Sequence, residues 1–408
     1  MNAETPQPVE SRSPGRLTLP SLAYASFVFG TPGILTGLLL IDIGVTFGVP
    51  VGIMGQIRTA SSFVAMGSAL LVGVASMRFS HKILLQAGLA SLLASAIGCT
   101  FAQSYLMMLV FYPLTGLGMA MIAPMALTLI AQYFPLEKRA RAVSWFVTGG
   151  SLSYVIGSQM IVFLTKFGDW RLAYIGFVIP AIIIGLILSQ IGLPSPPRDS
   201  GEESRSVNEG YRAIFTRRSA LACLLATALR LGSFQMILIY GTSFFREQFG
   251  VTRGLSSILM TVVALAYSTG SFTVGRLIER YGRRRLTILT TLLSGLSTIL
   301  MTLSPNFTVA LLMNVFAGWF SGMANSAAQS LNLEQVPEFR GIMMSLNASS
   351  GNLGAALGGG IGGFALLAYG YWVSGTVLGA IGILAALIYM FMTVDPSAQA
   401  RETPVEYS

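Results

Sequence analysis

GRLIERYGRR, at residues 275–284, and GVASMRFSHK, at residues 73–82, each join two long apolar segments of the chain. The two loops are basic and begin 202 positions apart, close to half of the 408 residues. A pattern that recurs after half a sequence indicates a duplicated unit. Because membrane transporters are built from two structurally similar halves, the repeat predicts a duplicated membrane bundle and makes solute transport our leading hypothesis.

The composition also favours a membrane protein. The chain is 53% apolar and 10% charged, whereas soluble domains have about 25% charged residues. The net charge of +9 comes from basic residues in short loops, so we expect a lipid bilayer rather than a nucleic acid as the partner. Cys99 and Cys223 lie in apolar segments and are predicted to be packing residues, with no disulfide, metal site or cofactor. The first 17 residues are polar, so we expect no cleaved signal.

Twelve segments reach the length of about 20 apolar residues that a spanning helix needs. The stretch from Pro194 to Arg217 is rich in proline, serine and charge, and is predicted to link six spans to six. We therefore predict an all-α integral membrane fold of twelve transmembrane helices in two pseudo-symmetric six-helix bundles. The predicted parts are a tail (1–17), a first bundle (18–193), a linker (194–217), a second bundle (218–394) and a tail (395–408). The predicted spans are 18–45, 52–77, 83–102, 105–133, 141–165, 171–193, 219–245, 254–277, 285–303, 307–333, 341–367 and 371–394.

Basic residues gather on one side of these spans. With the amino terminus and the even-numbered loops in the cytoplasm, 19 of the 25 basic residues face inward and four face outward. This asymmetry predicts that both termini are cytoplasmic, in a multi-pass protein of the cell membrane, either inner or plasma. The two remaining basic residues, Arg58 and Arg230, lie within predicted spans.

Several of the loops resemble those of the major facilitator superfamily. GRLIERYGRRR at 275–285 is similar to its signature loop, PLEKRARA at 135–142 and PEFRGIM at 337–343 to its second duplicated loop, and GDWRLAYIGF at 168–177 to its entry to span six. Residues 37–85 resemble the sugar-efflux and drug-efflux branch. The resemblance implies the twelve-span transporter fold. It also implies a cytoplasmic gate, for which the candidate residues are Gly73, Arg78, Arg139, Gly275, Glu279, Arg280, Arg284 and Arg340.

Some positions depart from the family pattern. In the first signature loop Met77 stands where the second loop has Glu279, so the resemblance implies an asymmetric gate. Such a carboxylate gains about 0.3 to 1 kcal/mol against a helix amino terminus when it is exposed. Tyr112 replaces the fourth-span arginine of proton-coupled drug exporters, Gly157 and Ser158 stand in place of Gly-Pro, and Gly33 replaces a first-span acid. These differences argue against a drug/proton antiporter.

Arg230 is the candidate for solute recognition. It lies 12 residues after Arg218, or about 18 Å into a core about 30 Å thick, where a charge persists mainly if it faces protein or water. We predict no acid near the midplane, since Asp42 is expected near the outer interface and Glu334 near the inner one. Arg230 either receives an anionic group of the solute or is a structural arginine held by carbonyls or a hydroxyl. Its helical face also carries Thr227, Ser233, Phe234 and Gly241.

Four further patterns each leave two interpretations open. Span ten places Asn314, Gly318, Ser321, Asn325 and Asn332 within about 40° of one another, as a cavity wall or as hydrogen bonds between helices. Gly351, Gly354, Gly358 and Gly362 indicate close helix packing, or a sliding surface. Arg58 is expected near the outer face, paired with Asp42 or at a solvated edge, and Pro32 and Gly33 indicate a kink or an interrupted helix.

The sequence thus predicts a monomeric secondary active or facilitative transporter, and not an enzyme, that moves a small polar and anionic organic solute by alternating access. The candidate contact residues are Arg230, Thr227, Ser233, Phe234, Asn314, Ser321, Asn325 and Tyr112. One alternative is a proton-coupled drug or sugar exporter. Another is a transporter-like membrane sensor or scaffold that binds its ligand without moving it.

Overall fold

A computed structural model describes residues 15–134, 136–194 and 207–395, within which the chain is helical and contains no strand. All twelve predicted spans are helices. Eleven of them are long and apolar enough to cross a membrane; the twelfth, α3 (Gln56–Arg78), is more polar and includes Arg58. The other helices of the amino-terminal half are α1 (Thr18–Phe47), α2 (Val51–Met54), α4 (His81–Thr100), α5 (Tyr105–Phe111), α6 (Leu114–Tyr133), α7 (Leu136–Leu152), η1 (Ser153–Gly157), α8 (Ser158–Leu164), α9 (Arg171–Ala173), η2 (Tyr174–Val178) and α10 (Ile179–Gly192).

The carboxy-terminal half repeats this plan with longer uninterrupted helices. It is preceded by a short helix, α11 (Val207–Thr216), within the predicted linker. Its elements are α12 (Arg218–Gln235), η3 (Met236–Tyr240), α13 (Gly241–Phe249), α14 (Arg253–Tyr281), α15 (Arg283–Leu303), α16 (Phe307–Leu333), η4 (Pro337–Phe339), α17 (Arg340–Tyr369) and α18 (Tyr371–Met392).

The helix ends follow from local sequence. Ser80, Ser104, Thr252 and Asn306 each accept a backbone N–H of the helix that they precede, which satisfies donors that have no partner inside the helix. Gly48 ends α1 at φ 66°, a left-handed conformation that costs glycine little. Short polar loops can therefore end one span and begin the next.

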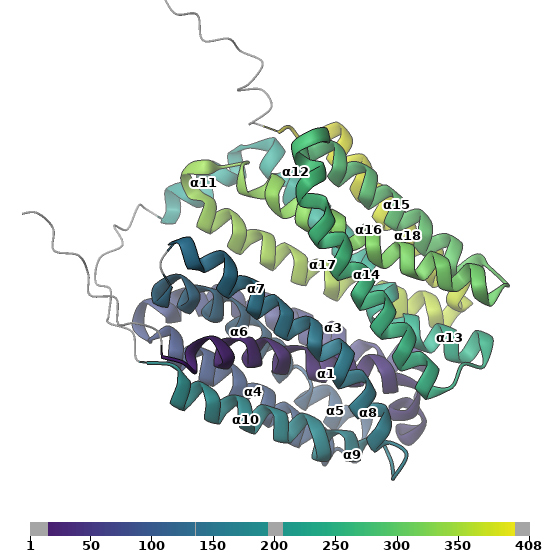
Figure 1. Cartoon of the computed structure of the whole chain (residues 1–408). Helices are drawn as coiled ribbons and strands as arrows, with labels where there is room; N and C mark the ends of the chain where they lie inside the picture. The colour runs from purple at the N-terminus through teal and green to yellow at the C-terminus, as the bar shows by residue number, and fades with distance from the viewer. Residues whose placement is uncertain (1–14, 135, 195–206, 396–408) are drawn as a thin grey trace, which may run out of the picture.

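Each half packs mainly on itself, as Figure 1 shows for the purple-to-teal and green-to-yellow groups of helices. In the amino-terminal half α1 packs on α7 and α10, and α6 packs on α3 and α4. In the carboxy-terminal half α15 packs on α16 and α18, and α12 packs on α17 and α18. Between the halves, α3 contacts α17 and α8 contacts α14.

The glycines of α17 are packing residues, as one of the two interpretations predicted. A methyl group on Gly354 would lie 1.9 Å from the carbonyl oxygen of Ala228, and one on Gly358 would lie 2.2 Å from that of Gly232. The backbones of α12 and α17 therefore touch, which only glycine permits at these positions.

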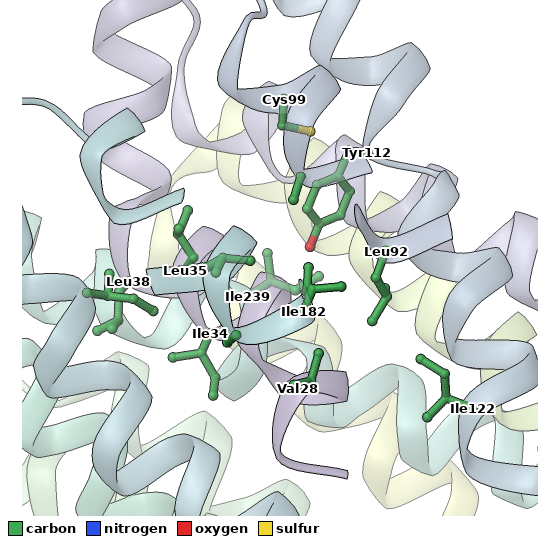
Figure 2. Close-up of a cluster of buried hydrophobic side chains, with 14 of the residues drawn as sticks. Val28, Ile34, Leu35, Leu38, Leu92, Cys99, Tyr112, Ile122, Ile182 and Ile239 are labelled. Carbon is green, nitrogen blue, oxygen red and sulfur yellow. The ribbon is translucent and has the colours of Figure 1, made fainter. Parts of the chain in front are cut away.

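Two sides of the molecule can be distinguished. Thr18 at the start of α1 donates to the carbonyl of Gly192 (2.9 Å), and the amide of Val394 donates to Ser219 at the start of α12 (2.9 Å). We call the side with these ends the terminal side. On the other side, which we call the closed side, the main hydrophobic core crosses between the halves. Figure 2 shows Ile239 of η3 beside α1 residues such as Ile34 and Leu35.

Candidate functional site

A cavity of about 570 Å³ lies between the two halves. The amino-terminal half contributes α7 and η1 to its wall, and the carboxy-terminal half contributes α12, η3, α13, α14 and α16. Most of the wall is aliphatic or aromatic, with hydroxyl and amide groups between. The lining residues are Val147, Gly150, Ser151, Tyr154, Leu231, Phe234, Ile237, Leu238, Gly241, Thr242, Phe245, Leu259, Met260, Val263, Ala264, Tyr267, Ser268, Ser271, Phe272, Asn314 and Ser326.

Two irregular turns shape this cavity. The π-helical turns η1 and η3 interrupt spans five and seven, and they supply the lining residues Tyr154, Ile237 and Leu238. A π-turn inserts an extra residue into a helix and is often found at functional sites. In spans five and seven, the residues after the π-turn therefore point in a different direction from the one they would have in a continuous α-helix.

Polar groups are few at the cavity wall and include one with no partner. The side-chain oxygen of Asn314 is buried and accepts no hydrogen bond from the described residues. The rings of Phe234 and Tyr267 stack with their centroids 5.4 Å apart. Phe234 and Asn314 are thus the two predicted contact residues that line the cavity.

Arg230 is buried behind this wall, one helical turn before Phe234. Its Nη2 donates to the side-chain oxygen of Asn325 (3.1 Å), and its Nε has no partner among the described residues. In the part of the chain that the structure describes, no carboxylate forms an ion pair with Arg230. The structure thus brings Arg230 of α12 and Asn325 of α16 together as a hydrogen-bonded pair in which no described carboxylate balances the guanidinium charge.

The other predicted contact residues of this half form bonds between helices. Thr227 bonds the hydroxyl of Tyr389 (3.1 Å) and accepts from Asn332 (3.2 Å), while Ser321 bonds Ser294 (2.6 Å). A methyl group on Gly382 of α18 would lie 2.6 Å from the hydroxyl of Ser233, which is therefore turned toward that helix. These residues do not line the cavity in this conformation.

Tyr112 is also separate from the cavity. Its hydroxyl bonds Thr36 (2.9 Å) inside the amino-terminal half, and its ring is buried. Figure 2 shows Tyr112 next to Cys99 in the hydrophobic core. In this conformation the structure does not bring it together with Arg230.

The predicted gate residues lie on the terminal side, and their described contacts stay within one half. Arg139 donates to the carbonyls of Phe134 (3.0 Å) and Ala131 (2.7 Å) at the end of α6, and Arg340 bonds Leu333 and Glu334 at the end of α16 in the same manner. Arg284 donates to the carbonyl of Met390, and Arg280 stacks over Tyr281. Arg78 and Gly275 are exposed. The surroundings of Gly73 and the side chains of Met77 and Glu279 lie outside the described part.

Charged contacts between the halves occur on the closed side. Arg246 of α13 donates to Asp42 of α1 (2.6 Å), and Arg253 of α14 bonds the same carboxylate. Thr242 bonds the carbonyl of Gly37. The expected pairing of Asp42 with Arg58 was wrong, because Asp42 is already bridged by these two arginines of the other half.

Sequence reasoning did not single out Tyr154 or Tyr267, and it placed Arg58 at the outer edge. In the structure Arg58 Nη1 donates to the carbonyl of Gly33 (2.8 Å), in the middle of α1. The long side chain carries the guanidinium from the first turn of α3 toward the centre of the bundle.

The chain belongs to the Major Facilitator Superfamily, whose sequence pattern it matches over residues 21–252 and 223–407. It is 23% identical over 378 residues to an uncharacterized MFS-type transporter, YbcL, of Bacillus subtilis (90% of this chain, 93% of that one). It is 25% identical over 300 residues to a probable 4-methylmuconolactone transporter of Cupriavidus pinatubonensis (71% and 69%). It is 22% identical over 376 residues to a probable sugar efflux transporter of Helicobacter pylori (91% and 94%).

The same fold occurs in a solved structure. The crystal structure of a D-xylose-proton symporter superposes with a TM-score of 0.77 and 15% identity, over 93% of this chain and 98% of that one. At this identity the similarity establishes the fold. The chain is therefore a multi-pass, twelve-helix transporter of the superfamily, as the sequence predicted.

Proposed function

We propose that the protein is a secondary active or facilitative transporter that moves a small polar organic solute across the cell membrane by alternating access, with both termini cytoplasmic. The observation that carries this proposal is the cavity of about 570 Å³ with walls from both halves. A solute held there contacts two bodies that can rock against each other. In this conformation the halves bond each other on the closed side, so the cavity would exchange solute on the terminal side.

We further propose that the solute is anionic and that Arg230 contributes to its recognition. A buried guanidinium with an unbonded Nε, whose partners are the neutral side chains of Asn325 and Tyr389, is costly unless another polar group completes its bonds. A modest movement of the Phe234–Tyr267 stack would expose Arg230 and Asn325 to the cavity. The unpartnered oxygen of Asn314 supplies an acceptor for a hydroxyl or amide of the same solute.

A second candidate is a proton-coupled exporter of sugars or drugs. One relative is named a probable sugar efflux transporter, and Asp42 offers a carboxylate that is 12% exposed and bonds two arginines of the other half. Protonation of this group would weaken the contact on the closed side and could couple proton movement to opening. This candidate predicts transport that depends on a pH gradient.

Flux in proteoliposomes tests these proposals. We expect uptake or efflux of anionic solutes to exceed that of neutral and cationic ones, and we expect Arg230→Ala to abolish most of the flux. Arg285→Ala, which removes an exposed arginine at the start of α15, is the matched control and should retain flux.

Three results would contradict the proposal in different ways. Binding without flux under any condition would identify a sensor or scaffold instead of a transporter. Movement of cationic drugs by a pH gradient, with Arg230→Ala unimpaired, would favour the exporter. Loss of flux when a dimer dissociates would contradict the predicted monomer, whereas normal flux from the monomeric protein would support it.

A further inference from the structure

Arg58 is a second arginine at the depth of the cavity. Its guanidinium contacts Gly33, which lies 15 residues after Thr18 and therefore about 22 Å along α1. The side chain is half-buried, and its one hydrogen bond among the described residues is the 2.8 Å bond to the Gly33 carbonyl. The remaining guanidinium N–H groups are available to another acceptor.

The guanidinium lies next to the cavity wall. A methyl group built on Gly37 would be 3.6 Å from Arg58 Nη1, 3.5 Å from Met260 and 3.2 Å from the carbonyl oxygen of Leu238. Met260 and Leu238 both line the cavity. Arg58 therefore lies directly behind the part of the cavity wall that Leu238 and Met260 form, although it does not itself line the cavity in this conformation.

Phenol groups lie near the Arg58 guanidinium. Tyr112, Tyr154 and Tyr240 are close enough to interact with its charge. Tyr154 also lines the cavity. No carboxylate of the described ranges forms an ion pair with Arg58, since Asp42 is bonded to Arg246 and Arg253.

We infer that Arg58 and Tyr154 form an anion-binding subsite at the closed end of the cavity, and that its ligand is the carboxylate of an organic solute. This inference deepens the proposed function and rests on it. A guanidinium offers two parallel N–H groups that match a carboxylate, and a phenol adds a third donor. The carboxylate would supply the counter-charge that the surrounding residues lack.

The wall restricts the rest of the solute. Around the subsite the cavity is lined by Leu238, Met260, Leu259 and Phe245, with Phe234 and Tyr267 stacked further along. Aromatic and aliphatic walls favour an apolar or aromatic body. The substrate class is therefore a small carboxylate with an apolar or aromatic body, with one carboxylate directed to Arg58 at the closed end.

Binding of three matched probes to the purified full-length protein in lipid nanodiscs tests the subsite. The probes are 3-phenylpropanoate, 3-phenylpropanamide and 3-phenylpropylamine, which share a body and differ in charge, and the method is calorimetry. We expect the carboxylate to bind at least about tenfold more tightly than the amide, since bonds to a charged group are the stronger ones. Arg58→Gln should remove this preference and leave amide binding within about twofold, and Arg58→Lys should restore part of it.

A second pair of variants tests the subsite without altering Arg58. A methyl group on Gly33 would lie 3.7 Å from Arg58 Nη2, which is ordinary contact, so Gly33→Asp can place a carboxylate against the guanidinium. We expect Gly33→Asp to abolish the preference for 3-phenylpropanoate and the isosteric Gly33→Asn to retain it. Equal behaviour of these two variants would overturn the inference.

The outcomes separate this inference from the proposed function. If Arg230→Gln removes the charge preference and Arg58→Gln does not, the subsite at Arg58 is wrong, while anion transport through Arg230 stands. If the wild-type protein binds the amide as tightly as the carboxylate but transports neutral solutes, the subsite is again wrong and transport stands. Absence of flux for every solute contradicts the proposed function itself.

Discussion

The closed side and the terminal side both carry arginines at helix ends, but these arginines bond different partners. On the closed side, Arg246 and Arg253 bond Asp42 in the opposite half. On the terminal side, Arg139 and Arg340 bond the ends of α6 and α16 in their own halves. Charge on the closed side therefore holds the halves together, whereas the described charge on the terminal side stabilises each half separately.

The comparison predicts that added bulk between the halves on the closed side lowers the population of this conformation more than the other substitutions do. A methyl group on Gly52 would lie 2.5 Å from the carbonyl oxygen of Gly363 in the other half, and backbone cannot move aside cheaply. Gly52→Ala should therefore destabilise the closed contact by about 1 to 3 kcal/mol. Spin labels at exposed positions 167 and 372 should report a longer distance across the closed side.

Gly67→Ala is the control for this substitution, because a methyl group there meets nothing within 4 Å. The control should leave the distance unchanged. An unchanged distance in Gly52→Ala would mean that the approach of α2 and α17 does not hold this side closed.

Removal of the bridging carboxylate should have the next largest effect. Asp42→Asn leaves two arginines without their anion, and the pair is partly exposed at Arg253, which limits the loss to about 1 to 2 kcal/mol. The same label pair should show a larger open population, and the effect of Asp42→Asn should shrink in high salt. Asp169→Asn breaks an ion pair within one half and should not alter the distance.

Loss of a single hydrogen bond between the halves should change the population of this conformation less than loss of the Asp42 carboxylate does. Thr242→Val keeps the shape of the side chain and removes its bond to the carbonyl of Gly37, a loss of about 1 kcal/mol. The expected change in population is about fivefold at the closed side. Thr376→Val removes a bond within α18 alone, so a shift as large in this control would show that threonine loss acts through general stability.

The smallest effects are expected on the terminal side. Glu279→Gln should destabilise the conformation in which the terminal side is closed by about 0.3 to 1 kcal/mol, and Met77→Asp should stabilise that conformation. Spin labels at exposed positions 79 and 281, in the two duplicated loops, measure this distance. No shift in either variant would remove the asymmetric gate predicted from the two loops.

The fold was predictable from the sequence because long apolar segments and basic loops leave few arrangements in a bilayer. The twelve helices and the packing role of Gly354 and Gly358 followed directly. The pair formed by Arg230 and Asn325 was indicated by polar residues on two helical faces, although their direct bond needed the structure. These are local patterns with a period of 3.6 residues.

The arrangement around the cavity was less predictable, for two physical reasons. A helical wheel gives the direction of a side chain but not the neighbouring helix that it meets: Phe234 and Gly241 line the cavity, whereas Thr227 and Ser233 of the same predicted face contact other helices. Moreover, a long side chain can carry its charge far from its own backbone position. Arg58 starts near the closed side of α3 and ends at the middle of α1.

The π-turns η1 and η3 make the cavity sensitive to chain length as well as to side-chain identity. Each residue of an α-helix advances the chain by about 100°, so a single deletion within residues 236–240 or 153–157 would convert the turn to an α-helix and rotate the next segment by that angle. The face of α13 toward the cavity and the face of α8 toward α14 would change without any substitution. Gain or loss of one codon in these two turns is therefore a short evolutionary route to a new solute specificity on the same twelve-helix frame.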